Sequence, residues 1–150
     1  MRNPIAIGAA TLLIALSFGV AACGSSEDSS DGALTNSELI AQANEICVKY
    51  TDEVSTAAEE AFGDQQPPNA ELAVFITDEV VPLYEDQIAE LRALEPSEDD
   101  SAAYTEMLDT LETELQAVAE DPEAAAASDN PFPDATAKAD EFGLEDCGSR

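Results

Sequence analysis

Apolar residues recur at helical spacing along three stretches of the chain, with acidic residues between them. In the first stretch they fall within an arc of about 120° on a helical wheel, as in a helix with one face in a core. These residues are Leu39, Ile40, Ala43, Ile46, Cys47, Tyr50, Val54, Ala57, Ala58 and Ala61. Residues 35–38, Thr-Asn-Ser-Glu, match a capping box, and Gly63 is a natural stop. The pattern predicts a helix that begins in this capping box and ends near Phe62.

A second helix is predicted from Asn69, which can cap it, to about Leu94. Residues 65–68, Gln-Gln-Pro-Pro, interrupt helical structure before this helix, and Glu-Pro at 95–96 ends it. Apolar residues lie on several sides of this helix, so we expect it at the centre of a bundle. Pro82 has no backbone N–H and should kink the helix.

A third helix can start at residues 97–100, Ser-Glu-Asp-Asp, because a serine cap and acidic residues stabilise a helix N-terminus. Its apolar residues again fill about 120° of the wheel. They are Tyr104, Met107, Leu108, Leu111, Leu115, Val118 and Ala119. We interpret this stripe as core, and the tyrosines of the three helices as core residues and not as a ligand cage.

Two proline-containing breaks follow, at residues 121–122 and 130–133. Asp134 can cap a last short helix through Phe142, and Gly143 can end it. No stretch alternates between apolar and polar residues, so no strand is predicted. The expected fold is all-α: a small bundle of three long helices plus a short C-terminal helix.

The N-terminal segment differs from the rest of the chain. Arg2 precedes an apolar run at residues 5–20, and two alanines then lead to Cys23. A charged start, a short apolar run and small residues are typical of a secretion signal. Val20-Ala21-Ala22-Cys23 resembles the lipobox of bacterial lipoproteins, which implies cleavage before Cys23 and a diacylglyceryl group on its sulfur. The alternatives are an uncleaved anchor and an ordinary cleaved signal.

These features divide the chain into a lipoprotein signal peptide at 1–22, a lipidated cysteine with a flexible acidic tether at 23–34, and a helical domain at 35–150. Lipid on Cys23 would place the protein on the extracytoplasmic face of the cell membrane, because two acyl chains give stable anchoring. It would also leave Cys47 and Cys147 to form a disulfide in an oxidising compartment, closing the bundle.

A wider resemblance covers most of the predicted mature chain. It is carried by the segments 43–47 (Ala-Asn-Glu-Ile-Cys), 80–82, 91–96 and 142–148, and by Tyr104. These segments look like small uncharacterised lipoproteins and secreted proteins of high-GC Gram-positive bacteria. The resemblance implies a helical envelope protein closed by a disulfide, and it carries no functional residues across.

The charge limits the partners. With 33 acidic and five basic residues the formal net charge is −28, so nucleic-acid binding is excluded and membrane contact should come from the lipid alone. The chain contains no histidine, which removes most nucleophile–base arrangements and zinc sites. Glu98, Asp99 and Asp100 are the best local candidates for a cation, but a first helical turn that complements the helix dipole explains them better.

The leading hypothesis is therefore a non-enzymatic envelope lipoprotein without a cofactor, which binds another protein or an envelope component. The alternative is a protein that binds cations or a small ligand through surface carboxylates or a pocket between helices. A third hypothesis is a hydrolase that uses two close carboxylates. Sequence alone does not choose between these classes of function.

Overall fold

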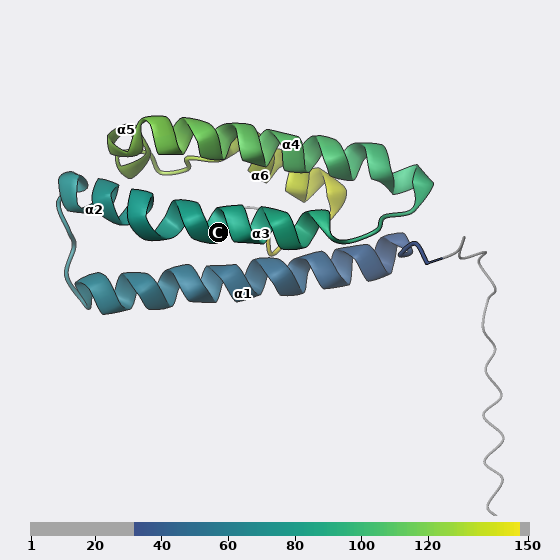
Figure 1. Ribbon diagram of the computed structural model, residues 1–150, viewed down its shortest axis with the longest axis horizontal. Helices are drawn as coiled ribbons and strands as arrows, with labels where there is room; N and C mark the ends of the chain where they lie inside the picture. The colour runs from purple at the N-terminus through teal and green to yellow at the C-terminus, as the bar shows by residue number, and fades with distance from the viewer. Residues whose placement is uncertain (1–31, 148–150) are drawn as a thin grey trace, which may run out of the picture.

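The computed structural model describes residues 32–147, and these residues form a bundle of helices (Figure 1). The predicted signal peptide, Cys23 and most of the predicted tether lie outside the described residues. The elements are α1 (Asn36–Phe62), α2 (Asn69–Phe75), the π-helical turn η1 (Ile76–Val80), α3 (Val81–Arg92), α4 (Glu98–Glu120), α5 (Pro122–Ala126) and α6 (Pro133–Phe142). Within residues 32–147 there is no strand, so the all-α fold is confirmed.

The second long helix, made of α2, η1 and α3, lies between α1 and α4 in Figure 1. Its α3 part packs against both of these neighbours, while α2 packs against α5 and α6 packs against α4. The central position predicted from its several apolar sides is confirmed. None of the helices within residues 32–147 has the length and apolar character needed to cross a membrane.

The predicted start and stop of α1 are confirmed. The Thr35 hydroxyl accepts a hydrogen bond from the Glu38 N–H at 3.4 Å, and the Glu38 carboxylate accepts one from the Thr35 N–H at 3.0 Å. The Thr35 hydroxyl also donates to the Glu38 carboxylate at 2.7 Å, and this bond together with the one from the Thr35 N–H lowers the pKa of Glu38. Gly63 ends the helix with a positive φ of 56°, a conformation that costs glycine little.

The predicted kink at Pro82 takes the form of a wider helical turn. Pro82 cannot donate a hydrogen bond to the carbonyl four residues earlier, and its ring crowds that carbonyl. The chain passes through η1 immediately before it, and the N–H of Val81 bonds to the carbonyl of Ile76, five residues earlier. Such turns insert an extra residue and change the face that the following helix presents.

Two predicted caps are wrong. Asn69 is the first residue of α2, and Pro68 occupies the cap position. Asp134 lies inside α6, and the carboxylate of Glu114 on α4 accepts hydrogen bonds from the N–H groups of Asp134 and Ala135, at 3.0 and 2.9 Å. Glu114, which is distant in the sequence, thus caps the first turn of α6, where the side chain of Asp134 was expected to act as the cap.

The core runs along the inner faces of α1, α3, α4 and α6. Its buried members are Leu39, Ala43, Cys47, Leu91, Tyr104, Met107, Leu108, Ala139 and Leu144. The hydroxyl of Tyr104 donates to the carbonyl of Leu91 at 2.9 Å, and burial raises the pKa of Tyr104 to about 12. Gly143 ends α6 at φ 94°, and the chain turns back so that Leu144 is fully buried.

The predicted Cys47–Cys147 disulfide is present and joins α1 to the end of the described chain. Leu34, near the start of the described chain, also contacts the bundle. The N–H of Leu34 donates to the carbonyl of Glu95 at 2.7 Å, and the Leu34 side chain packs against the core. Leu34, placed at the end of the tether by its sequence context, therefore belongs to the folded domain.

Candidate functional site

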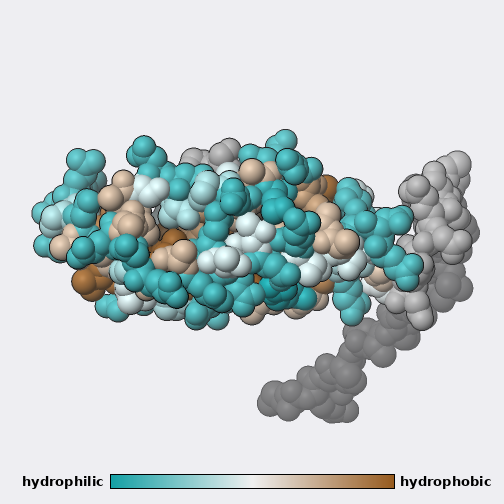
Figure 2. Space-filling view, turned by 90° about the horizontal axis from the view of Figure 1, so that it is seen from above, coloured by the Kyte–Doolittle hydropathy of each residue, from teal (hydrophilic) through white to brown (hydrophobic). Residues whose placement is uncertain are grey.

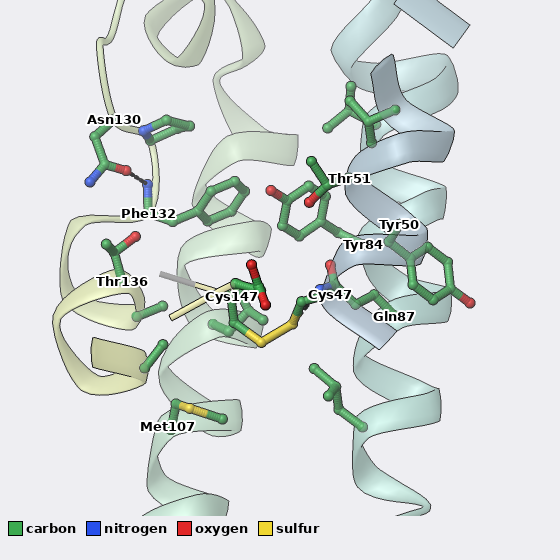
Figure 3. Close-up of a pocket in the computed structure, with 18 of the residues that line it drawn as sticks. Cys47, Tyr50, Thr51, Tyr84, Gln87, Met107, Asn130, Phe132, Thr136 and Cys147 are labelled. Atoms are coloured by element: carbon green, nitrogen blue, oxygen red, sulfur yellow. Dashed lines mark hydrogen bonds between the residues drawn. A yellow bond between two sulfur atoms is a disulfide. The ribbon is translucent and has the colours of Figure 1, made fainter. Parts of the chain in front are cut away.

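A cleft of about 450 Å³ opens between α1 and α3 on one side and α4, α6 and the α5–α6 loop on the other (Figure 3). We call it the disulfide cleft, because both cysteines line it. Its lining residues are Cys47, Tyr50, Thr51, Val54, Val80, Tyr84, Gln87, Leu91, Met107, Leu111, Asp129, Asn130, Pro131, Phe132, Ala135, Thr136, Ala139, Asp146 and Cys147.

Gln87 is the buried polar residue of this cleft, with only 7% of its surface exposed. Its side-chain nitrogen lies 3.2 Å from the sulfur of Cys47, which accepts a hydrogen bond (Figure 3). The side-chain carbonyl oxygen of Gln87 accepts no hydrogen bond from residues 32–147. In this part of the chain, every side-chain polar atom that is fully enclosed has a hydrogen-bond partner. The carbonyl oxygen therefore borders open space, and the open space beside Gln87 is the cleft.

Two aromatic rings meet across the cleft. Tyr84 comes from α3 and Phe132 from the α5–α6 loop, and their rings stack at a centroid distance of 4.8 Å with 20° between the planes (Figure 3). Burial raises the pKa of Tyr84, so its phenol stays protonated and uncharged well above neutral pH. Tyr84 therefore offers the cleft an aromatic face and a neutral hydroxyl.

The loop that carries Phe132 is held together by its own side chains. Ser128 donates to the carbonyl of Asn130 at 2.9 Å, and the Asn130 side-chain oxygen accepts from the N–H of Phe132 at 2.9 Å. Below the loop, Glu114 holds the first turn of α6. The stacking of Phe132 on Tyr84 joins this loop to α3, which forms the opposite wall of the cleft.

The charged groups of the cleft are acidic. Asp129 and Asp146 line it, and among residues 32–147 no lysine or arginine does. The three basic residues of the described chain pair with carboxylates elsewhere on the surface, at 2.6–2.7 Å: Lys49 with Glu90, Arg92 with Asp109 and Glu112, and Lys138 with Glu106. Their charges are therefore compensated locally, and the cleft lies in a negative field.

The weak cation candidates lie at the start of α4, away from the cleft lining. Asp100 is engaged in the fold: its two side-chain oxygens accept hydrogen bonds from the Ser97 hydroxyl at 2.8 Å and the Asn36 side-chain nitrogen at 2.9 Å. Within the described part of the chain, no three or more acidic or cysteine residues are grouped in a way that could hold a metal ion. Cys23, the predicted lipidation site, lies outside that part.

Sequence reasoning missed the cleft residues. Tyr84, interpreted as a core residue, is only half-buried and faces the cleft. A signal existed at Gln87, because it lies between Tyr84 and Leu91 at helical spacing and so places a polar group on an apolar face. No local signal could bring Phe132 to Tyr84, since the two residues are 48 positions apart in the sequence.

Comparison with known proteins finds no match for this chain among protein-family models, curated proteins or solved structures. Apolar walls, a few convergent polar groups and a volume within the range of about 300–1,000 Å³ are the properties of small-molecule sites. The arrangement suits reversible binding of a small organic molecule.

Proposed function

We propose that this protein is a lipid-anchored, non-enzymatic binding protein of the cell envelope, which takes up a small molecule in the disulfide cleft. The observation that carries the proposal is the carbonyl oxygen of Gln87, a polar atom of a buried residue that borders the cleft and accepts no hydrogen bond from residues 32–147. Because this oxygen borders open space, a ligand that donates a hydrogen bond to it would gain about 0.5–1.5 kcal/mol net, or about 1.5–3 kcal/mol if the donor is charged.

The anchor in this proposal is Cys23, supported by the lipobox-like residues before it. The folded domain begins at Leu34, which is tied to Glu95 at one end of the bundle (Figure 1). The ten residues between Cys23 and Leu34 could reach roughly 35 Å when fully extended. A tether of that reach would leave the cleft accessible from outside the membrane.

The surface favours a small ligand over a protein partner. Val48 and Val74 are the large apolar residues exposed on the described part of the chain, at 36% and 60%. Figure 2 shows a largely hydrophilic face on which apolar residues form small, separate groups. Stable protein–protein contacts usually need a larger apolar area at their centre. The cleft offers a better-defined site than any apolar surface patch.

The anchor and the cleft can be tested separately. Membrane fractionation of cells that express the full chain tests the anchor: the protein should sediment with membranes, and the Cys23→Ser variant should not. Intact mass of the wild-type protein should show a diacylglyceryl adduct and loss of residues 1–22. An unmodified Cys23, or a C23S variant that stays in the membrane in processed form, would contradict lipid anchoring.

For the cleft, ligand-observed NMR with a library of small fragments would use residues 23–150 carrying C23S. Thr136→Phe should fill the cleft, because Thr136 lines it, and should abolish the binding of the fragments that compete for one site. Ala137→Phe is the matched control, since Ala137 is the next residue of α6 and is exposed. If T136F and A137F have equal effects, or if no fragment binds, the cleft is not a ligand site.

A further inference from the structure

We propose that the ligand of the disulfide cleft is a small organic cation, with an ammonium group on an aromatic or aliphatic body. The inference rests on the proposed function, because it assigns a chemical class to the same site. Three independent features of the cleft carry it: the acceptor oxygen of Gln87, the acidic charge, and the aromatic faces.

The first feature is the orientation of the Gln87 amide. A disulfide sulfur has no proton to donate, so the amide turns its N–H₂ toward Cys47, 3.2 Å away. The opposite end of the amide, its carbonyl oxygen, is then presented to the cleft. This end can only accept hydrogen bonds, and its complement is a donor such as an ammonium N–H.

The second feature is the charge. Asp129 gives the cleft a carboxylate for which residues 32–147 supply no hydrogen-bond or ion-pair partner, while every basic side chain in that part of the chain is already paired. A ligand with a negative charge would meet this carboxylate and a formal net charge of −28. A cation would instead be drawn to the cleft and would complement its charge.

The third feature is the pair of rings. The negatively charged face of an aromatic ring attracts a cation within about 6 Å of its centre, and the attraction grows when water is excluded. Tyr84 and Phe132 both line the cleft and stack on each other, so each ring covers one face of the other and leaves the opposite face uncovered by its partner (Figure 3). Met107 and Leu111 form an apolar wall of the same cleft, suited to the body of the ligand.

Calorimetric titration of residues 23–150 carrying C23S tests the class with three probes of similar size and different charge and with one small cation. They are 2-phenylethylammonium, the neutral 2-phenylethanol, the anionic 3-phenylpropionate, and methylammonium, which has the charge without the body. We expect saturable one-site binding of 2-phenylethylammonium, at least tenfold tighter than that of 2-phenylethanol, and no saturable binding of the other two. Raised salt should weaken this binding without abolishing it.

The outcomes separate the two proposals. If 2-phenylethanol or 3-phenylpropionate binds as tightly as the cation, the cationic class is wrong while the cleft stands as a site. If methylammonium binds equally well, the cation is held by general surface charge and the inference fails. If no probe binds and the fragment library also yields no T136F-sensitive binder, the proposed function fails with it.

Variants then assign the three features. Gln87→Met keeps a side chain of similar length without the acceptor and should weaken cation binding by about tenfold or more, as expected for a hydrogen bond to a charged group. Phe132→Leu should weaken it by about threefold, because one ring face is lost. Thermal unfolding of each variant checks that it folds, and a folded Q87M with unchanged affinity would overturn the role of the oxygen.

The charge has a matched pair of variants. Asp129→Asn removes one carboxylate from the cleft, and Asp99→Asn removes one from the exposed first turn of α4, so both change the net charge equally. We expect D129N to weaken binding of 2-phenylethylammonium severalfold and D99N by less than twofold. Equal effects would show that the ligand responds to overall charge and not to Asp129.

Discussion

The rings of Tyr84 and Phe132 stack across the disulfide cleft, although the two residues belong to opposite walls of it. The contact ties the α5–α6 loop to α3. Because the side-chain hydrogen bonds of that loop run between its own residues, the ring contact has a large share in holding it over the cleft. The position of the loop should therefore depend on this pair.

Phe132→Ala tests that dependence. Loss of the stacked ring should free the loop, so that amide hydrogen exchange at residues 127–130 becomes faster, while the amides in the second half of α6 keep their protection. Tyr84→Ala should produce the same pattern, since either ring alone leaves the contact unmade. Unchanged exchange in the loop of both variants would show that the local hydrogen bonds suffice to hold it.

The carboxylate of Glu114 should act as the cap of α6. Glu114→Ala leaves two N–H groups of the first turn without their acceptor, and we expect a loss of about 1–2 kcal/mol in the free energy of unfolding. Asp134→Ala is the control, because the side chain of Asp134 caps nothing and its removal should cost less than about 0.5 kcal/mol. Urea denaturation measures the free energy of unfolding of both variants. A larger loss in D134A than in E114A would show that Asp134, and not Glu114, is the cap.

Reduction of the disulfide should destabilise the domain strongly. Cys47 and Cys147 are 100 positions apart, and closing a loop of that length stabilises a fold by up to about 4.7 kcal/mol in the chain-entropy model. The midpoint of urea unfolding should fall sharply in a reductant that frees both thiols, as shown by mass spectrometry of alkylated protein. A Cys47→Ala/Cys147→Ala double variant should already show the lower midpoint and should not respond to the reductant.

Alkaline pH should reveal the burial of Tyr104. Burial raises its pKa from 10.0 to about 12, so the folded state holds a proton that the unfolded state has already released between these values. Below pH 10 this difference in proton binding does not lower the stability. As the pH rises from 10 to 12, the free energy of unfolding should fall by roughly 2–3 kcal/mol.

Tyr104→Phe isolates this effect from the other tyrosines. The variant lacks the hydrogen bond to the Leu91 carbonyl and should be less stable at pH 8 by about 1–2 kcal/mol. Between pH 10 and pH 12 its stability should fall less than that of the wild-type protein. Parallel stability curves for the two proteins over this range would show that Tyr104 does not titrate as its burial requires.

Local patterns were sufficient for most of the helices. Helix ends are set by residues that bond to backbone groups close to them in the sequence. Examples are the capping box at Thr35, the serine at position 97 and the stop at Gly143. Such signals can be recognised from adjacent residues alone. Cysteine counting gave the disulfide for a similar reason, because only two cysteines remained once Cys23 was assigned to lipid. The all-α class followed from these local signals.

The long-range features were beyond such patterns. Glu114 caps α6 from another helix, and Phe132 on the α5–α6 loop meets Tyr84 on α3, far away in the sequence. The cleft depends on how the helices are spaced, which follows from the whole set of core contacts and not from any one stripe. Of its polar residues, Gln87 alone carried a sequence signal, as a polar group on an apolar helical face.

The most direct test of the central claim is a two-dimensional NMR titration of the isotope-labelled chain from residue 23, carrying C23S, with 2-phenylethylammonium. We predict that the side-chain amide of Gln87 and the backbone amides of Thr51 and Thr136 shift saturably with one common dissociation constant. Shifts that grow without saturation and spread over exposed acidic residues such as Glu45 and Glu106, with the Gln87 amide unmoved, would contradict a ligand site in the disulfide cleft.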